Sequence, residues 1–84
     1  MSKVQADLVN LVQGVVLSLV DEPDQASIES SKEGDTLIIE IRVGPDDVGK
    51  VIGRQGRIIK AIRTLARAAS AYMSGPRIEV EVVD

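Results

Sequence analysis

Cysteine and histidine are both absent from this 84-residue sequence. Without cysteine the chain cannot form disulfides or thiolate zinc sites, which suits a reducing compartment. Without histidine it lacks the commonest general base and the commonest metal ligand, so Ser-His, Cys-His and H-E-x-x-H chemistry is excluded. We therefore expect a protein that is not an enzyme, with no metal, no cofactor and no small-molecule substrate.

Aromatic residues are almost absent as well, because the chain has no Phe or Trp and Tyr72 is its one tyrosine. Such a chain cannot build the aromatic platform on which many RNA-binding sheets stack bases. Tyr72 lies near the end of an expected helix, where we expect it to pack against the protein.

Long hydrophobic runs are also missing. Residues 8–20 are the most apolar stretch, but polar residues interrupt them and they are shorter than the ~20 residues that cross a bilayer. No cleavage site with the small-residue pattern of a signal peptide follows. We expect no membrane span and a cytoplasmic location. A chain of this length is expected to form one domain, residues 1–84, around a single core of two packed layers.

Apolar periodicity predicts six regular elements, with the spacing of three and four typical of helices and the alternation typical of strands. In chain order these are helix 4–20, strand 26–32, strand 36–43, helix 46–52, helix 57–73 and strand 77–82. The order α-β-β-α-α-β predicts an α+β fold in which three helices cover one face of a three-stranded sheet. Most of the apolar stripe of the first helix is expected to be core, with some surface left for a partner.

The expected core residues follow from the same patterns. Alternation in strand 36–43 puts Leu37, Ile39, Ile41 and Val43 on the buried face. The buried side of helix 57–73 is expected to carry Ile58, Ile59, Ile62, Leu65, Ala66, Ala69 and Met73.

The net charge of −3 hides an uneven distribution. Residues 48–78 contain seven basic residues and no Asp or Glu, so this segment carries +7 and the rest of the chain −10. On the long helix the residues Arg57, Lys60, Arg63 or Thr64, and Arg67 are spaced by three or four and share one face, opposite the isoleucines. A solvated helix face is the plain explanation of such a stripe, whereas the exclusion of acids favours a polyanionic partner.

Two glycine motifs in this segment raise the question of phosphate binding. Residues 44–50 follow the P-loop pattern G-x-x-x-x-G-K, but Val51 stands where a magnesium-binding hydroxyl belongs. Pro45 has no N–H to offer, and the carboxylates of Asp46 and Asp47 would repel a triphosphate. We therefore reject nucleotide binding and expect these acids to begin the short helix.

The second motif is G-x-x-G at residues 53–56, between the two expected helices. Glycines allow a tight reversal and the close approach of a sugar-phosphate backbone. Arg54 and Gln55 at the tip offer a cation and an amide, and the next helix offers free N–H groups at its N-terminus. Alone, the motif also fits an ordinary corner between two helices.

The run VIGRQGRII at residues 51–59 closely resembles the V-I-G-x-x-G-x-x-I core of KH domains. The element order resembles the type II, prokaryotic, form of that fold, and the resemblance spans essentially the whole chain. The sequence is most similar to the small stand-alone KH proteins of the bacterial KhpA (YlqC-type) family of RNA-binding proteins.

The resemblance implies that the G-x-x-G loop clamps the backbone of about four nucleotides of single-stranded RNA, with the bases over an aliphatic groove. The loop here is Gly53, Arg54, Gln55 and Gly56. The groove floor implied is Val48, Val51, Ile52 and Ile59, with strand 36–43 as the other wall. Charge and proximity suggest Lys50, Arg57 and Lys60 as further phosphate contacts.

The resemblance also implies a role in post-transcriptional regulation, and either a homodimer or a heterodimer with a larger KH-containing partner. The tip of the loop carries one cation, Arg54, so modest affinity for RNA is expected. The alternative is a degenerate KH domain that serves as a protein-protein scaffold.

Overall fold

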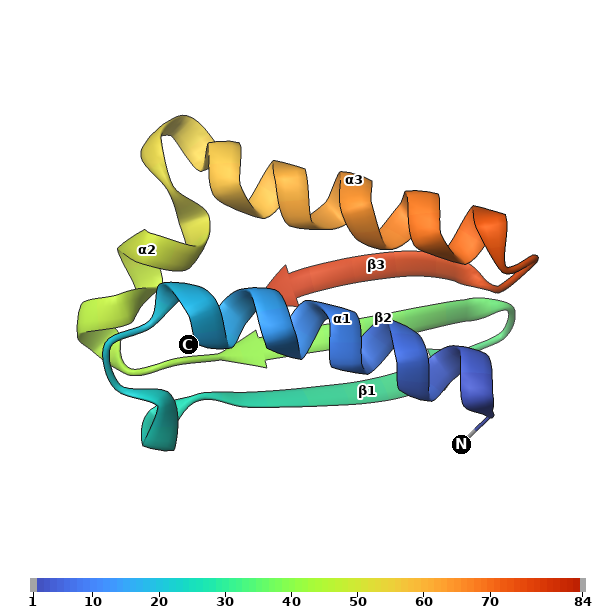
Figure 1. Cartoon of the computed structure of the whole chain (residues 1–84), viewed down its shortest axis with the longest axis horizontal. Coiled ribbons are helices and arrows are strands. Elements are labelled where there is room, and N and C mark those ends of the chain that lie inside the picture. The colour runs from blue at the N-terminus through green and yellow to red at the C-terminus, as the bar shows by residue number, and fades with distance from the viewer. Residues whose placement is uncertain (1, 84) are drawn as a thin grey trace.

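The computed structural model describes residues 2–83 (Figure 1). Its regular elements follow the expected order, and no bound differs from the expected one by more than two residues. They are α1 (Lys3–Leu19), β1 (Ser27–Glu33), β2 (Thr36–Arg42), α2 (Val48–Ile52), α3 (Arg57–Tyr72) and β3 (Arg77–Val82). Short 3-10 turns precede β1, α2 and α3, at Pro23–Gln25, Pro45–Asp47 and Arg54–Gly56.

The three strands form one mixed sheet in the order β1-β2-β3. β1 and β2 are an antiparallel hairpin in which Ser30 lies opposite Ile39, and Gly34 takes a left-handed conformation in its turn. β2 and β3 run parallel, with Ile39 opposite Val80, and α2 and α3 form the crossover that a parallel pair requires. β2 is therefore the central strand, and β1 and β3 are the edges.

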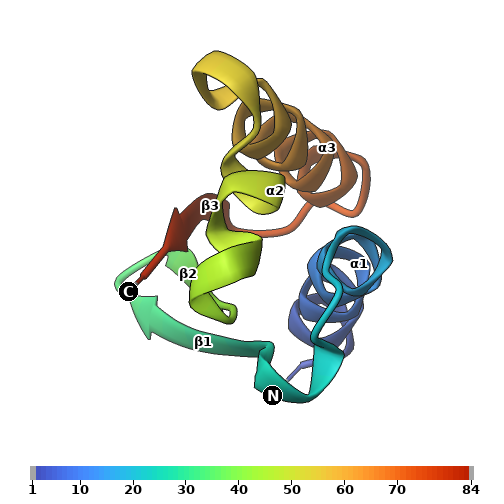
Figure 2. The ribbon, with the colours of Figure 1, turned by 90° about the vertical axis from the view of Figure 1, so that its left-hand side faces the viewer.

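The three α-helices lie on the same side of the sheet (Figure 2). α1 contacts β1 and β2, while α2 and α3 contact β3. Between these layers the side chains of Leu37, Ile39 and Ile41 are at most 1% exposed, as their alternation predicts. The rest of the core consists of Leu8, Val12 and Val16 on α1, Val51 on α2, Ile59, Ile62 and Ala66 on α3, and Ile78 and Val80 on β3. The α+β prediction is confirmed.

Two core predictions on α3 are wrong. Leu65 is 45% exposed and Tyr72 is 93% exposed. α3 packs on the sheet through Ile59, Ile62 and Ala66, and this face is narrower than the apolar stripe of the sequence. Leu65 lies at the outer margin of the stripe, and Tyr72 is the last residue of the helix, just before the chain turns back to β3.

Candidate nucleic-acid interface

α2 is the short element that leads into the G-x-x-G turn. It has five residues, and such a length cannot stabilise a helix by its own hydrogen bonds. Within α2 the side chain of Val51 is fully buried in the core. The helix is closed by a hydrogen bond of 2.8 Å from the N–H of Gly53 to the carbonyl of Gly49. Packing against the rest of the protein therefore determines where α2 points.

The turn itself needs glycine at its first position. Gly53 has φ 77° and ψ 172°, and an added Cβ would lie 2.3 Å from Cγ1 of Ile58. Gln55 and Gly56 are both left-handed, with φ 57° and 75°. Arg54 and Gln55 are exposed at the bend, which projects at one end of the molecule (Figure 1). The tip offers its cation and its amide to solvent, as the motif predicts.

α3 begins directly after this turn. No side chain caps its N-terminus at Gly56, and the N–H of Arg57 donates to the carbonyl of Arg54, so the positive end of the helix dipole faces the bend. Arg57 and Lys60 are exposed in the first turns and Arg67 farther along. The predicted basic stripe therefore lies on the surface and starts at the G-x-x-G turn.

Arg63 belongs to the same stripe but is tied to the sheet. Its Nε donates to the backbone carbonyl of Val80 at 3.0 Å, so this carbonyl points away from β2 toward the open edge of β3. We call the hollow between α3 and this edge the β3-edge trough. One part of about 220 Å³ is lined by Arg63, Arg67, Glu79, Val80 and Glu81. A second part of about 430 Å³ is lined by Arg67, Ala71, Gly75, Pro76, Arg77, Ile78 and Glu79.

The four aliphatic residues implied as the groove floor differ in how far they are buried. Val51 is 0% and Ile59 5% exposed, so both support the surface from below, whereas Val48 and Ile52 are half-buried and reach it. The predicted wall on strand 36–43 is wrong. β2 is paired on both edges and its inward side chains are buried, so the strand whose edge is open beside the helices is β3.

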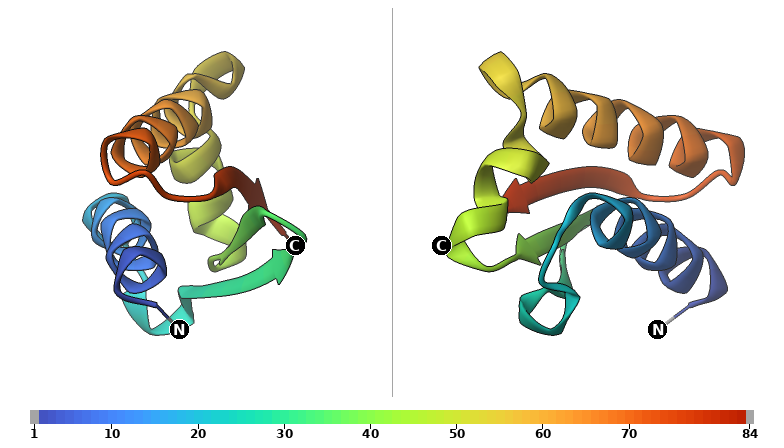
Figure 3. Two further views of the ribbon diagram at one scale, coloured as in Figure 1. Left: turned by 90° about the vertical axis from the view of Figure 1, so that its right-hand side faces the viewer. Right: turned by 60° about the vertical axis from the view of Figure 1, so that its left-hand side comes forward.

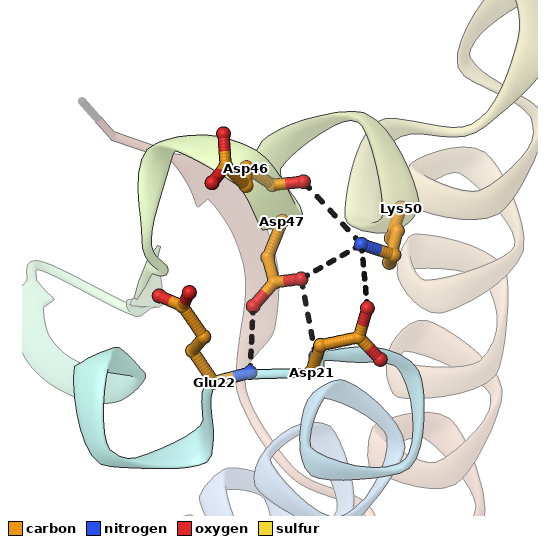
Figure 4. A network of polar contacts seen from close by, with 5 residues as sticks. All are labelled: Asp21, Glu22, Asp46, Asp47 and Lys50. Carbon is orange, nitrogen blue, oxygen red and sulfur yellow. Dashed lines mark hydrogen bonds and ion pairs between the residues drawn. The ribbon is translucent and has the colours of Figure 1, made fainter.

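Lys50, implied as a phosphate contact, is held by carboxylates. Its Nζ lies 3.0 Å from Oδ1 of Asp47 and 3.0 Å from Oδ2 of Asp21, and donates to the carbonyl of Asp46 at 3.4 Å (Figure 4). Asp47 is 1% exposed, and its two oxygens accept the backbone N–H groups of Asp21, at 3.1 Å, and Glu22, at 3.0 Å. We call this arrangement the Asp47 clasp.

Both central groups of the clasp, the carboxylate of Asp47 and the ammonium of Lys50, stay charged. The pKa of Asp47 lies below its usual value, chiefly because the Asp21 N–H donates to it, with smaller contributions from Lys50 and from the Glu22 N–H, while burial acts in the opposite direction. The pKa of Lys50 is raised, first by its contact with Asp21 and then by Asp47. An ion pair of this kind is intact at neutral pH.

Sequence reasoning missed the role of Asp47. The Asp-x-x-Lys spacing was visible, but the N–H groups that the carboxylate accepts belong to residues 25 and 26 positions earlier in the chain. The false P-loop is explained at the same time. Residues 45–47 form a 3-10 turn with Asp47 buried inside the clasp, so they do not form a loop with N–H groups turned toward a phosphate.

Residues 2–83 offer neither a metal site nor a membrane-spanning helix. These residues include no group of three or more His, Cys, Asp or Glu side chains arranged to hold a metal ion. Within the same span no helix has both the length and the apolar character to cross a membrane.

Three relatives named RNA-binding protein KhpA are similar to this chain. The Clostridium acetobutylicum protein is 44% identical over 73 residues, which cover 87% of this chain and 96% of the relative. The Caldanaerobacter subterraneus protein is 45% identical over 73 residues, with the same coverage. The Borreliella burgdorferi protein is 41% identical over 76 residues, covering 90% of this chain and 92% of the relative.

Two solved structures share the fold. Aquifex aeolicus Era bound to GDP and AlF4⁻ superposes with a TM-score of 0.64 at 20% identity, covering 99% of this chain and 33% of Era. Era in complex with MgGDPNP and nucleotides 1506–1542 of 16S ribosomal RNA gives a TM-score of 0.60 at 22% identity, covering 90% of this chain and 30% of Era. This chain therefore corresponds to about a third of Era.

A family model described as the KH domain of KhpA and KhpB matches residues 9–82. The match includes the G-x-x-G turn, the basic face of α3 and the Asp47 clasp. The chain belongs to the KhpA/KhpB KH-domain family.

Proposed function

We propose that this protein binds single-stranded RNA without catalysis and acts in post-transcriptional regulation. The observation that carries the proposal is the exposed G-x-x-G turn at the head of a basic helix face, within a segment that has seven basic residues and no acid. The relatives named RNA-binding protein KhpA support it, as does the Era fold, one structure of which is a complex with ribosomal RNA.

In this proposal the phosphates lie against the turn and the first two turns of α3. Gly53 and Gly56 let the sugar-phosphate backbone approach closely, because neither places a side chain in its way. Arg54, Arg57 and Lys60 are exposed there and offer three cations, and Gln55 offers its amide. The positive end of the α3 dipole favours the same anion.

The bases are proposed to lie beside α2 and α3. Val48 and Ile52 offer half-buried aliphatic surface, supported from below by Val51 and Ile59. The β3-edge trough lies farther along α3, and its part beside Arg63 is lined mainly by charged side chains, so the aliphatic contacts are proposed for Val48 and Ile52. Aliphatic contacts of this kind suit a chain without an aromatic platform.

Salt dependence tests the proposal directly. In a plot of the logarithm of the binding constant against the logarithm of the salt concentration, each phosphate neutralised on a single strand contributes about −0.7 to the slope. With three exposed cations near the turn, we expect a slope of about −2 for a mixed-sequence single-stranded oligoribonucleotide, measured by fluorescence anisotropy. Absence of binding at low salt would contradict RNA binding and favour the scaffold alternative. Magnesium-dependent ATP binding would contradict our rejection of the P-loop.

We also propose that the chain forms a homodimer through one exposed stripe of α3. The stripe consists of Ala61, Leu65, Ala68 and Tyr72, all exposed, at the spacing of one helix face. It carries no charge, and its small and large side chains alternate, so that an antiparallel second copy can place large residues against small ones. α1 and α3 lie side by side (Figure 3). By helical spacing the stripe lies on a different flank from Lys60 and Arg67, with Arg57 at its margin.

Leu65→Glu is expected to prevent this pairing, because it places a charge in the middle of the uncharged stripe. Sedimentation equilibrium should give about twice the 9.0 kDa chain mass for the native protein and 9.0 kDa for the variant. Thr64→Glu, the same charge change one residue earlier and outside the stripe, should stay dimeric. A native protein of single-chain mass at high concentration would refute the homodimer. A heterodimer with a larger KH-containing chain stays a prediction.

A further inference from the structure

Lys50 differs from the cations at the G-x-x-G turn in its surroundings. Arg54, Arg57 and Lys60 are exposed, whereas the ammonium of Lys50 lies 3.0 Å from a carboxylate oxygen of Asp21 and 3.0 Å from one of Asp47. A phosphate that recruited Lys50 would have to compete with both. It would also leave the carboxylate of Asp47, which is 1% exposed, without its counter-charge, and an unpaired buried charge is strongly destabilising.

The clasp joins three segments that are separate in sequence. Asp21 and Glu22 follow the end of α1, Asp47 ends the turn before α2, and Lys50 lies within α2 (Figure 4). The carboxylate of Asp47 accepts both backbone N–H groups of the first segment and the ammonium of the third. One side chain therefore holds α2 against the end of α1.

The direction of α2 determines where the turn lies. α2 has five residues, so the burial of Val51 and the clasp orient it rather than its own hydrogen bonds. The hydrogen bond from the N–H of Gly53 to the carbonyl of Gly49 closes α2 and joins the helix to the turn. A rotation of α2 would therefore move Gly53, and with it the strained turn that presents Arg54.

We propose that Asp47 is a positioning residue for RNA binding, which acts through Lys50 and the end of α1 to aim α2 and the G-x-x-G turn, and that Lys50 serves this clasp instead of contacting phosphate. The proposal rests on the RNA binding proposed above for the turn. It replaces the phosphate role that the resemblance implied for Lys50.

Lys50→Met and Lys60→Met form a matched pair, because each removes one positive charge and replaces a lysine by an unbranched apolar side chain. For Lys50→Met we expect several-fold weaker RNA binding with an unchanged salt slope, and displaced amide resonances of Gly53 and Gly56 in the ¹H–¹⁵N spectrum of the free protein. For Lys60→Met we expect a slope less negative by about 0.7, with the two glycine resonances in place. Lys50→Arg, which retains the cation, should restore both readouts.

Asp47→Asn separates positioning from charge. Asparagine has one acceptor oxygen, so its NH₂ group faces either a backbone N–H or the ammonium of Lys50 and one contact of the clasp is lost. The variant makes the protein more positive by one charge, and electrostatics alone predicts tighter RNA binding. Our proposal predicts weaker binding, together with displaced Gly53 and Gly56 resonances. If Asp47→Asn does not fold, Lys50→Met alone decides.

Two results would overturn the proposal. One is a shallower salt slope for Lys50→Met with unmoved glycine resonances, which would make Lys50 a phosphate ligand. The other is RNA binding by folded Asp47→Asn that equals or exceeds that of the native protein. If the native protein binds no RNA, the proposed function fails, but the glycine resonances of the free variants still report on the clasp. Unmoved resonances in the free variants would then refute the positioning role of Asp47 without reference to RNA binding.

Discussion

Replacing both Arg54 and Gln55 with aspartate is expected to abolish binding of single-stranded RNA while the circular dichroism spectrum stays native. Both side chains are exposed at the turn, so the fold does not depend on them, and aspartate tolerates the left-handed conformation at Gln55. A hydrogen bond to a charged group contributes about 1.5–3 kcal/mol, and two carboxylates would repel the phosphate. Since 1.4 kcal/mol corresponds to a factor of ten, we expect binding at least roughly 100-fold weaker.

The matched control for this variant is Lys32→Glu combined with Gln13→Glu. It changes the net charge by the same amount, at two exposed positions on β1 and α1. Anisotropy titrations and crosslinking to cellular RNA should show near-native binding for the control. Persistent binding by the Arg54 and Gln55 double variant would mean that RNA contacts another surface. Equal losses in both variants would mean that net charge alone attracts the RNA.

Gly53→Ala is expected to cause the largest loss of stability among single substitutions in the turn. At φ 77° and ψ 172° an alanine is strained, at a cost of about 1–3 kcal/mol. Its Cβ would also lie 2.3 Å from Cγ1 of Ile58 and 2.8 Å from the backbone nitrogen of that residue, so the first turn of α3 would have to move. Urea denaturation should show a clear fall in the unfolding free energy, and RNA binding should fall with it.

Two other glycines of the same segment provide a graded comparison. Gly56 is left-handed, but an added Cβ would meet nothing closer than 3.9 Å, so Gly56→Ala should cost about 1–2 kcal/mol. Gly49 lies within α2 with open space around an added Cβ, so Gly49→Ala should stabilise the protein by about 0.5–1 kcal/mol. From most to least stable, the expected order is Gly49→Ala, the native protein, Gly56→Ala and Gly53→Ala. Equal stability of the last two would contradict the geometry of the turn.

The order and type of the elements could be predicted because they depend on local patterns. The alternation of Leu37, Ile39 and Ile41 sets which face of β2 is buried, and all three are buried in the structure. The two glycines of the turn were predictable for the same reason, since a tight reversal between helices restricts the residues at its own positions. The exposed basic face of α3 follows directly from helical spacing.

By itself the sequence determined the α+β element order, the position of the G-x-x-G turn and the segregation of charge into residues 48–78. Each is a property of neighbouring residues, set by backbone conformation and periodicity. The tertiary structure alone decided that β3 provides the open edge, that Leu65 and Tyr72 are exposed, and that Lys50 is held by Asp21 and Asp47. These features depend on which distant segments the fold brings together, and no local pattern of residues specifies that.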